Sequence, residues 1–319
     1  SRASCLGHNN KRVMIMLPDY YEFFNPVKVI AGNKALENIP FELTRLHVKR
    51  PIILTDKGVL KAGLIKVVLD SFGDSDVVIG AICDDITSDS PVDVVNATAR
   101  IFRDKQCDSL IAVGGGSVID TAKGVNILVS EGSDDIMKFR GVYRLTAPQR
   151  PLIAVPTTAG SGSEATMVAM IYSPVKKLKI PFVSILMLPE VAILDPRMIL
   201  SLPPKLTAAT GMDALSHAVE AYSGLQKNPL SDAYAVSAIN LIRENLVNSV
   251  KDGKDKDARF AMANASLIAG IAFSNSMVGA THSIGHACGA LACIHHGTAM
   301  AMLLPVVMEY NFDKVSQYY

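Results

Sequence analysis

The chain has 319 residues, 49% of them hydrophobic, and its 31 basic and 30 acidic residues leave a net charge of +1. A chain of this length and composition can bury a large core and is expected to form two domains. The balanced charge excludes the basic surface of a nucleic-acid-binding protein or of a protein that binds anionic membranes, and the longest apolar runs, such as 13–17, are too short to span a bilayer.

The cysteines indicate a reducing compartment. Cys5, Cys83, Cys107, Cys288 and Cys293 show no zinc-ribbon or CxxC spacing, and their number is odd, which favours free thiols. The N-terminus also lacks the charged, apolar and small-residue regions of a secretory signal. We therefore expect a cytoplasmic protein.

The first part of the chain alternates short β-branched runs with helical stretches. The expected strands are residues 27–32, 51–56, 76–82, 109–116 and 152–158. This alternation is typical of βαβ units around a parallel sheet.

Strand signals stop after the Pro-containing segment 190–206. From Thr207 onward the sequence is Ala-rich with a helical period, and it breaks near 223–229 and 251–257. We therefore predict an α/β plus all-α architecture, with an α/β domain at residues 1–200 and an all-helical domain at 201–319.

Two loops of small residues follow strands in the α/β half. In 109–124, SLIAVGGGSVIDTAKG, an apolar strand runs into three glycines, and Ser117 then opens a helix whose free N–H groups suit a pyrophosphate. The segment 155–166, VPTTAGSGSEAT, follows another strand with glycines and hydroxyl residues. Open α/β sheets bind ligands at such strand ends. A tight turn that needs positive φ is the alternative explanation of the three glycines.

Asp56 stands at the end of the run PIILTD. A carboxylate there can accept hydrogen bonds from a ribose and would repel a 2′-phosphate. A helix N-cap or turn residue is an equally good interpretation of a lone aspartate.

Histidines and a carboxylate cluster in the helical half. Asp213 and His217 are four residues apart in GMDALSHAVEAY (211–222) and share a helix face. The segment THSIGHACGALACIHHG (281–297) holds four of the seven histidines. One Asp/His pair is more often an N-cap or a core pair, but the two clusters together favour a site for divalent iron or zinc. Spacing alone leaves the choice open among His282, His286, His295 and His296.

These motifs resemble those of the iron-containing (group III) alcohol dehydrogenases. The matching pieces, in family order, are GGGSVID, PTTAGSGSEAT, LPEVAILDP, GMDALSHAVEAY and the HSIGH…HHG segment. The resemblance implies a Rossmann-like dinucleotide-binding domain followed by a helical metal-binding catalytic domain. It also implies an NAD-dependent oxidoreductase that interconverts a small alcohol and its aldehyde or ketone by hydride transfer from a metal-bound alkoxide.

The resemblance assigns roles to particular residues. It implies a divalent metal, Fe(II) with zinc as the alternative, held by Asp213, His217, His282 and His296. It places His286 off the metal, near the nicotinamide, where this residue either relays a proton or only makes a hydrogen bond. It implies that Asp56 selects NAD over NADP and that the dinucleotide is bound by Gly115, Gly116, Ser117, Asp120, Thr157, Thr158, Ser161 and Lys177.

The resemblance also bears on partners and on alternative functions. It implies a small alcohol or aldehyde substrate and a homo-oligomer, with no nucleic acid and no membrane as partners. Because family members carry further helices after the metal-binding segments, we expect a chain truncated at its C-terminus. Two alternatives stay open: a dehydroquinate synthase-like or glycerol dehydrogenase-like relative, and a non-catalytic assembly subunit. The D-x-x-x-H segment disfavours the dehydroquinate synthase-like relatives, whose metal set begins with a glutamate.

Overall fold

The computed structural model describes residues 18–292 and 294–318, so the sequence predictions for 13–17, Cys5 and Cys293 lie outside the described residues. The described helices include none with the length and apolar composition that a membrane span requires. Cys83, Cys107 and Cys288 are free thiols.

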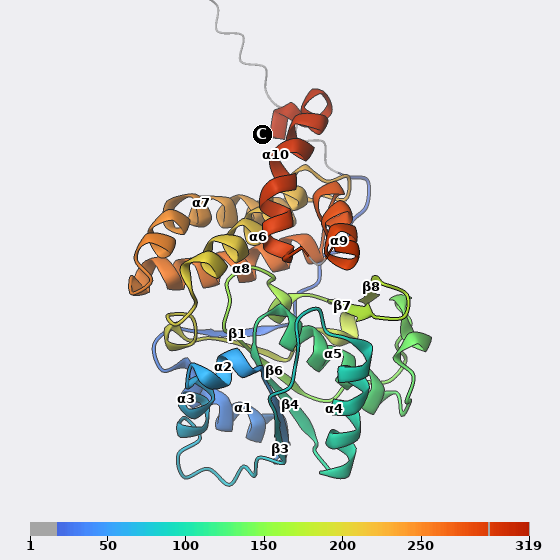
Figure 1. Ribbon diagram of the computed structural model, residues 1–319, viewed down its shortest axis with the longest axis vertical. Coiled ribbons are helices and arrows are strands. Elements are labelled where there is room, and N and C mark those ends of the chain that lie inside the picture. Colours follow the sequence, from blue (N-terminus) through green and yellow to red (C-terminus); the bar gives the residue numbers. More distant parts are fainter. Residues whose placement is uncertain (1–17, 293, 319) are drawn as a thin grey trace, which may run out of the picture.

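A six-stranded parallel sheet forms the centre of the N-terminal half (Figure 1). Its order is β1-β9-β6-β4-β2-β3, and every neighbouring pair is parallel. The inner strands are buried on both faces, which explains why they appear in the sequence as continuous apolar runs. The strands are β1 (Lys28–Ala31), β2 (Pro51–Leu54), β3 (Ala81–Cys83), β4 (Ser109–Gly114), β6 (Leu152–Pro156) and β9 (Val191–Leu194).

Helices cover both faces of this sheet. Side chains alternate along each strand, so Ile52 and Leu54 pack with α4 and α5 on one face, while Ile53 packs with α1, α2 and α3 on the other. The parallel α/β half expected from the sequence is thus confirmed. The helices are α1 (Ile39–Arg45), α2 (Lys57–Lys61), α3 (Leu64–Asp70), α4 (Val92–Asp104) and α5 (Gly116–Ser130).

The strands differ from the expectation in two places. Within the predicted strand 76–82, the structure assigns strand only from Ala81, in β3. A three-stranded sheet that the sequence did not reveal has the order β5-β8-β7, in which β7 and β8 are antiparallel. In this sheet β7 packs against α5, and β8 contacts a helix of the C-terminal half (Figure 1). Its strands are β5 (Gly141–Val142), β7 (Val168–Ser173) and β8 (Leu178–Val183).

The C-terminal half is helical, as predicted. The first three helices pack through small side chains, since Ala218, Ala238 and Ala269 are fully buried together. The breaks fall where the sequence placed them, and Asn228 and Asp255 cap the helices that follow. The helices are α6 (Pro204–Ser223), α7 (Pro229–Lys251), α8 (Lys256–Ser274), α9 (Ala280–Ala292) and α10 (His296–Val315).

The connection between β9 and α6 joins the two halves. The predicted domain boundary near residue 200 falls within it and stays a prediction. Arg259 of α8, which is 2% exposed, holds the connection through its guanidinium. That group donates hydrogen bonds to Leu202 O (2.9 Å) and Thr207 Oγ1 (2.6 Å). Arg259 therefore ties α8 to the connection and to the first turn of α6.

Candidate functional site

A cleft of about 1150 Å³ lies between the two halves and is lined by residues of both. It brings together residues that are far apart in the sequence. Of the predicted site residues, those that line it are Asp56, Gly115, Gly116, Ser117, Asp120, Thr157, Thr158, Ser161, Asp213, His217, His282, His286 and His296.

Lys177 is the exception among the predicted site residues. It lies exposed in the turn between β7 and β8, with a φ of 50°, and it does not line the cleft. Lys179, which the sequence reasoning missed, does line the cleft, and its Nζ lies 2.6 Å from Asp89 Oδ1. Which lysine of this segment reaches the cleft depends on where the hairpin turns, and the sequence pattern gave no signal for that turn.

The two loops of small residues lie next to each other, because they follow the neighbouring strands β4 and β6. A Cβ on Gly116 would lie 2.8 Å from Ser161 Cβ, so glycine is required for this close approach. Gly114, Gly115 and Gly116 all lack positive φ, which removes the turn explanation of these glycines. No side chain caps the N-terminus of α5, so its first N–H groups suit an anionic ligand.

Lys123 of α5 makes buried hydrogen bonds to the second loop, the one that follows β6. It is 1% exposed, and burial lowers the pKa of its ammonium group to about 8. Asp120, one turn earlier, accepts a hydrogen bond from Ser163 Oγ at 2.5 Å. Lys123 Nζ donates to Ser163 Oγ (3.1 Å), Thr166 O (2.7 Å) and Val168 O (2.8 Å). The loop after β6 is therefore held by buried polar contacts.

Asp56 can be interpreted from the sequence either as a helix cap or as a ribose-binding residue, and its position is compatible with both. Its Oδ1 accepts a hydrogen bond from the Val59 N–H at 2.9 Å and caps α2, and the residue also lines the cleft. Its role toward a ribose stays a prediction.

Three predicted metal ligands meet in a buried cluster. Asp213 and His217 of α6 and His282 of α9 each place one ligand atom within 4.8 Å of the others. Asp213 Oδ1 and His282 Nε2 are 3.5 Å apart, buried and without hydrogen-bond partners. Buried polar atoms without partners are rare in proteins. A carboxylate and imidazoles that converge in this way fit a divalent metal ion.

His296 approaches the same cluster from the start of α10. Its Nε2 lies 3.3 Å from Asp213 Oδ1. Gly297 makes this position accessible, because a Cβ there would collide with Ala209 O of α6. The neighbouring His295 is exposed and occupies the N-cap position without a side-chain hydrogen bond. Tertiary packing thus separates two histidines that the sequence spacing could not.

Burial and neighbouring charges set the protonation of the cluster. Burial and the charge on His282 lower the pKa of His217 to about 3, so that its imidazole is neutral, as a metal ligand must be. Burial raises the pKa of Asp213, but the surrounding imidazoles outweigh this and bring it well below its ordinary value. His217 Nδ1 lies 3.3 Å from Gly160 O, which favours a hydrogen on Nδ1 and a free lone pair on Nε2.

His286 lies beside the cluster but outside the group of three. Its ring stacks on that of His296 with a centroid distance of 5.0 Å and meets that of His282 edge-on at 6.0 Å. Burial and the nearby His296 lower its pKa to about 3. Its imidazole is therefore neutral near physiological pH.

Glu220 is a buried residue of the site that the sequence reasoning missed. Its Oε2 lies 2.6 Å from His282 Nδ1. Burial lowers the pKa of His282, but the carboxylates of Asp213 and Glu220 outweigh this and raise it to about 9. The available signal was its position seven residues after Asp213, on the same helix face.

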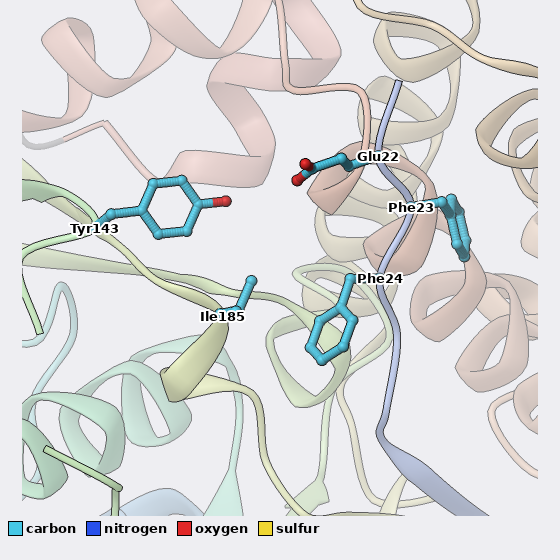
Figure 2. Close-up of a pocket in the computed structure, with 5 residues that line it drawn as sticks. All are labelled: Glu22, Phe23, Phe24, Tyr143 and Ile185. Carbon is cyan, nitrogen blue, oxygen red and sulfur yellow. The ribbon is translucent and has the colours of Figure 1, made fainter. Parts of the chain in front are cut away.

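A second hollow, of about 490 Å³, lies near the start of the described chain and is lined by Glu22, Phe23, Phe24, Tyr143 and Ile185 (Figure 2). Figure 2 shows the Tyr143 hydroxyl pointing toward Glu22 across the hollow, and Phe23 turned away from it. This hollow contains none of the predicted site residues. The larger cleft is the candidate site.

Comparison with known proteins gives the same family for both halves. The family model described as iron-containing alcohol dehydrogenase matches residues 26–196, and the C-terminal model of the Fe-containing alcohol dehydrogenase family matches residues 207–319. An NAD-dependent methanol dehydrogenase of Bacillus methanolicus is 36% identical over 289 residues, which cover 91% of this chain and 75% of that protein.

Solved structures agree with this result. The crystal structure of a 1,3-propanediol oxidoreductase superposes with a TM-score of 0.89 at 38% identity, covering 92% of this chain and 76% of that one. A sulfoacetaldehyde reductase from Bifidobacterium kashiwanohense, solved in complex with NAD+, superposes with a TM-score of 0.85 at 31% identity, covering 92% and 77%.

The geometry of the cluster predicts different effects for two adjacent histidines. We expect His296→Ala to lose stoichiometric metal, because His296 Nε2 lies beside Asp213 Oδ1, and we expect exposed His295→Ala to keep it. The measurement is the metal content of each variant after anaerobic loading with Fe(II) and desalting, with circular dichroism to check folding. Metal retained by His296→Ala and lost by His295→Ala would move the ligand by one residue.

Proposed function

Because the chain belongs to the iron-containing alcohol dehydrogenase family and is an oxidoreductase of that type, we propose that it transfers hydride between NAD(H) and a small alcohol or aldehyde in the cleft described above. One observation supports this most strongly. A single cleft joins two anion-suited loops of a parallel sheet to a buried cluster of a carboxylate and imidazoles.

The proposed metal ligands are Asp213, His217, His282 and His296, with Fe(II) as the metal and zinc as the alternative, since both accept such ligands. When bound, the metal supplies Lewis-acid polarisation of the substrate oxygen, and NAD(H) donates or accepts the hydride. On the dinucleotide side, Gly115, Gly116 and Ser117 bind the pyrophosphate at the start of α5. Asp120, Thr157, Thr158 and Ser161 line the same side, and Lys179 takes the place assigned to Lys177.

Apolar side chains line part of the same cleft. The Phe273 ring stacks on that of His217 with a centroid distance of 4.2 Å. Met277, Val278 and Leu206 line the same cleft. An apolar lining of this kind favours a small, weakly polar substrate.

His286 is proposed to carry the proton of the reaction. It lines the cleft, its imidazole is neutral, and its ring stacks on that of His296, so it lies between the metal cluster and the open cleft. A neutral imidazole can relay the hydroxyl proton of an alcohol, because one ring nitrogen receives a proton as the other releases its own toward solvent, and the reverse reaction uses the same relay.

We also propose a cellular location and an oligomeric state for the enzyme. The free thiols of Cys83, Cys107 and Cys288 support a cytoplasmic location. Among the described strands β1 pairs with β9 alone, and its unpaired edge supports a homo-oligomer.

The direct test is a dehydrogenase assay on anaerobically Fe(II)-loaded protein with NAD and a panel of primary alcohols, diols and hydroxy acids. We expect alcohol-dependent formation of NADH, followed by absorbance, and loss of this activity after chelation. Stoichiometric binding of metal and NADH without turnover of any alcohol would instead support a non-catalytic subunit.

Asp56→Gly is expected to relax the preference for NAD over NADP. The substitution removes the carboxylate that would accept the ribose hydroxyl and repel a 2′-phosphate, and glycine costs only a few tenths of a kcal/mol at an N-cap. The ratio of kcat/KM for NAD to that for NADP should fall about tenfold, the value of one hydrogen bond to a charged group. Asp255→Gly, which removes a similar cap from α8, is the control. Equal use of both cofactors by the unmodified protein would refute the prediction.

His286→Ala is expected to lose turnover and keep its metal. General acid–base assistance contributes roughly 10²–10⁴-fold, so kcat should fall on that scale or less, with partial rescue by added imidazole. His47→Asn serves as the control, since the His47 side chain is exposed and lies outside the cleft. Loss of metal from His286→Ala would place this histidine among the metal ligands.

A further inference from the structure

Glu220 is a buried carboxylate on the same face of α6 as Asp213 and His217. It follows Asp213 by seven residues and His217 by three, so all three lie on the face directed toward α9. It is 5% exposed, yet it is not one of the three residues whose ligand atoms meet in the cluster. Its carboxylate is directed instead at the start of the neighbouring helix.

This carboxylate accepts hydrogen from three donors of one short segment. Oε1 accepts from the Thr281 N–H at 2.6 Å, and Oε2 accepts from the Gly279 N–H at 2.9 Å and from His282 Nδ1 at 2.6 Å. The first two bonds place a negative charge at the N-terminus of α9, where the helix dipole favours it. The third holds the ring of a predicted metal ligand.

The segment is shaped to admit the carboxylate. A Cβ on Gly279 would lie 2.9 Å from Glu220 Oε1 and 3.2 Å from its Cδ. A side chain at position 279 would therefore push the carboxylate away from the start of α9. Glycine at this position and glutamate at 220 act as one unit that joins α6 to α9.

We propose that Glu220 is a positioning residue that fixes the ring tautomer of His282 and the placement of α9 on α6, so that both helices present their ligands to one metal ion. A carboxylate accepts hydrogen but does not donate it, so His282 carries its hydrogen on Nδ1. Nε2, 3.5 Å from Asp213 Oδ1, is then the nitrogen that would give up its proton to bind the metal. Outer carboxylates that hold ligating histidines in this way are known to tune metal affinity. The inference rests on the metal ligands proposed above.

Glu220→Gln tests the role with almost no change of shape. A carboxamide has one accepting oxygen for three N–H donors, so in either orientation its NH2 group meets a donor of α9 or the His282 ring. We expect the affinity for Zn(II), measured on metal-free protein by competition with a chelator, to fall about 10–100-fold. NADH affinity, measured by fluorescence, should stay unchanged.

The matched control is Glu131→Gln. Glu131 also accepts hydrogen bonds from two backbone N–H groups, those of Thr146 and Ala147, but it does not line the cleft. This variant should keep the Zn(II) affinity of the unmodified protein. Gly279→Ala, which displaces the carboxylate and keeps its charge, should weaken Zn(II) binding as Glu220→Gln does. Unchanged Zn(II) affinity in Glu220→Gln would reduce Glu220 to a helix cap and overturn the inference.

A second measurement determines the tautomer in the unmodified protein, and a variant is used only to assign the signal. With 15N-labelled histidine and bound Zn(II), long-range 1H–15N spectra report which ring nitrogen carries hydrogen, and His282→Asn identifies the signal. We expect hydrogen on Nδ1 and none on Nε2; the opposite tautomer would overturn the inference. Absence of Zn(II) binding by the unmodified protein would instead refute the proposed metal site, so the two failures are distinguishable.

Discussion

The buried carboxylate of Asp213 is the constraint on which the site depends. An ionised carboxylate far from water is strongly unfavourable unless positive or hydrogen-donating groups surround it. Here His217 from α6, His282 from α9 and His296 from α10 surround it, and a bound cation, or without one the proton that His282 holds with its raised pKa of about 9, supplies the positive charge. Each helix must approach closely to supply its ring, and Gly279 and Gly297 make this possible because a Cβ at either position would strike α6. The packing of the helical half is thus organised around one charge.

The proposed dinucleotide side and the proposed metal side of the cleft share one loop. The segment after β6 supplies Thr157, Thr158 and Ser161 to the cleft, and its Gly160 carbonyl lies against His217 Nδ1. Lys123 holds the far end of this loop through buried hydrogen bonds. A hydride must travel between two carbons held at contact distance, so a common rigid element is a direct way to set that distance. The loop after β6 therefore helps to set the distance between the two sides of the cleft.

The polar groups of the cluster form an inner set around Asp213 and an outer set that hydrogen-bonds to the histidine rings. Asp213 and the imidazoles face one another, while Glu220 and the Gly160 carbonyl lie behind His282 and His217 and bind their other ring nitrogens. The His282 ring is thereby turned so that its Nε2 lies on the side of the Asp213 carboxylate. Buried polar networks are favourable only when their members are satisfied. Asp213 Oδ1, His282 Nε2 and His296 Nδ1 are buried without partners, and the first two are atoms that a metal ion would bind.

The sequence by itself determined the architecture and most of the cleft. The hydrophobic period distinguishes a buried parallel sheet from helices, and the spacing of Asp213 and His217 places them on one helix face, because both features depend only on local geometry. Only the tertiary structure decided the rest. It separated His296 from His295, brought Lys179 rather than Lys177 to the cleft, and placed Glu220 behind His282. These outcomes depend on where a hairpin turns and on how closely two helices approach. A shift of one residue in a strand turns its side chains to the opposite face, and the local sequence pattern does not determine such shifts.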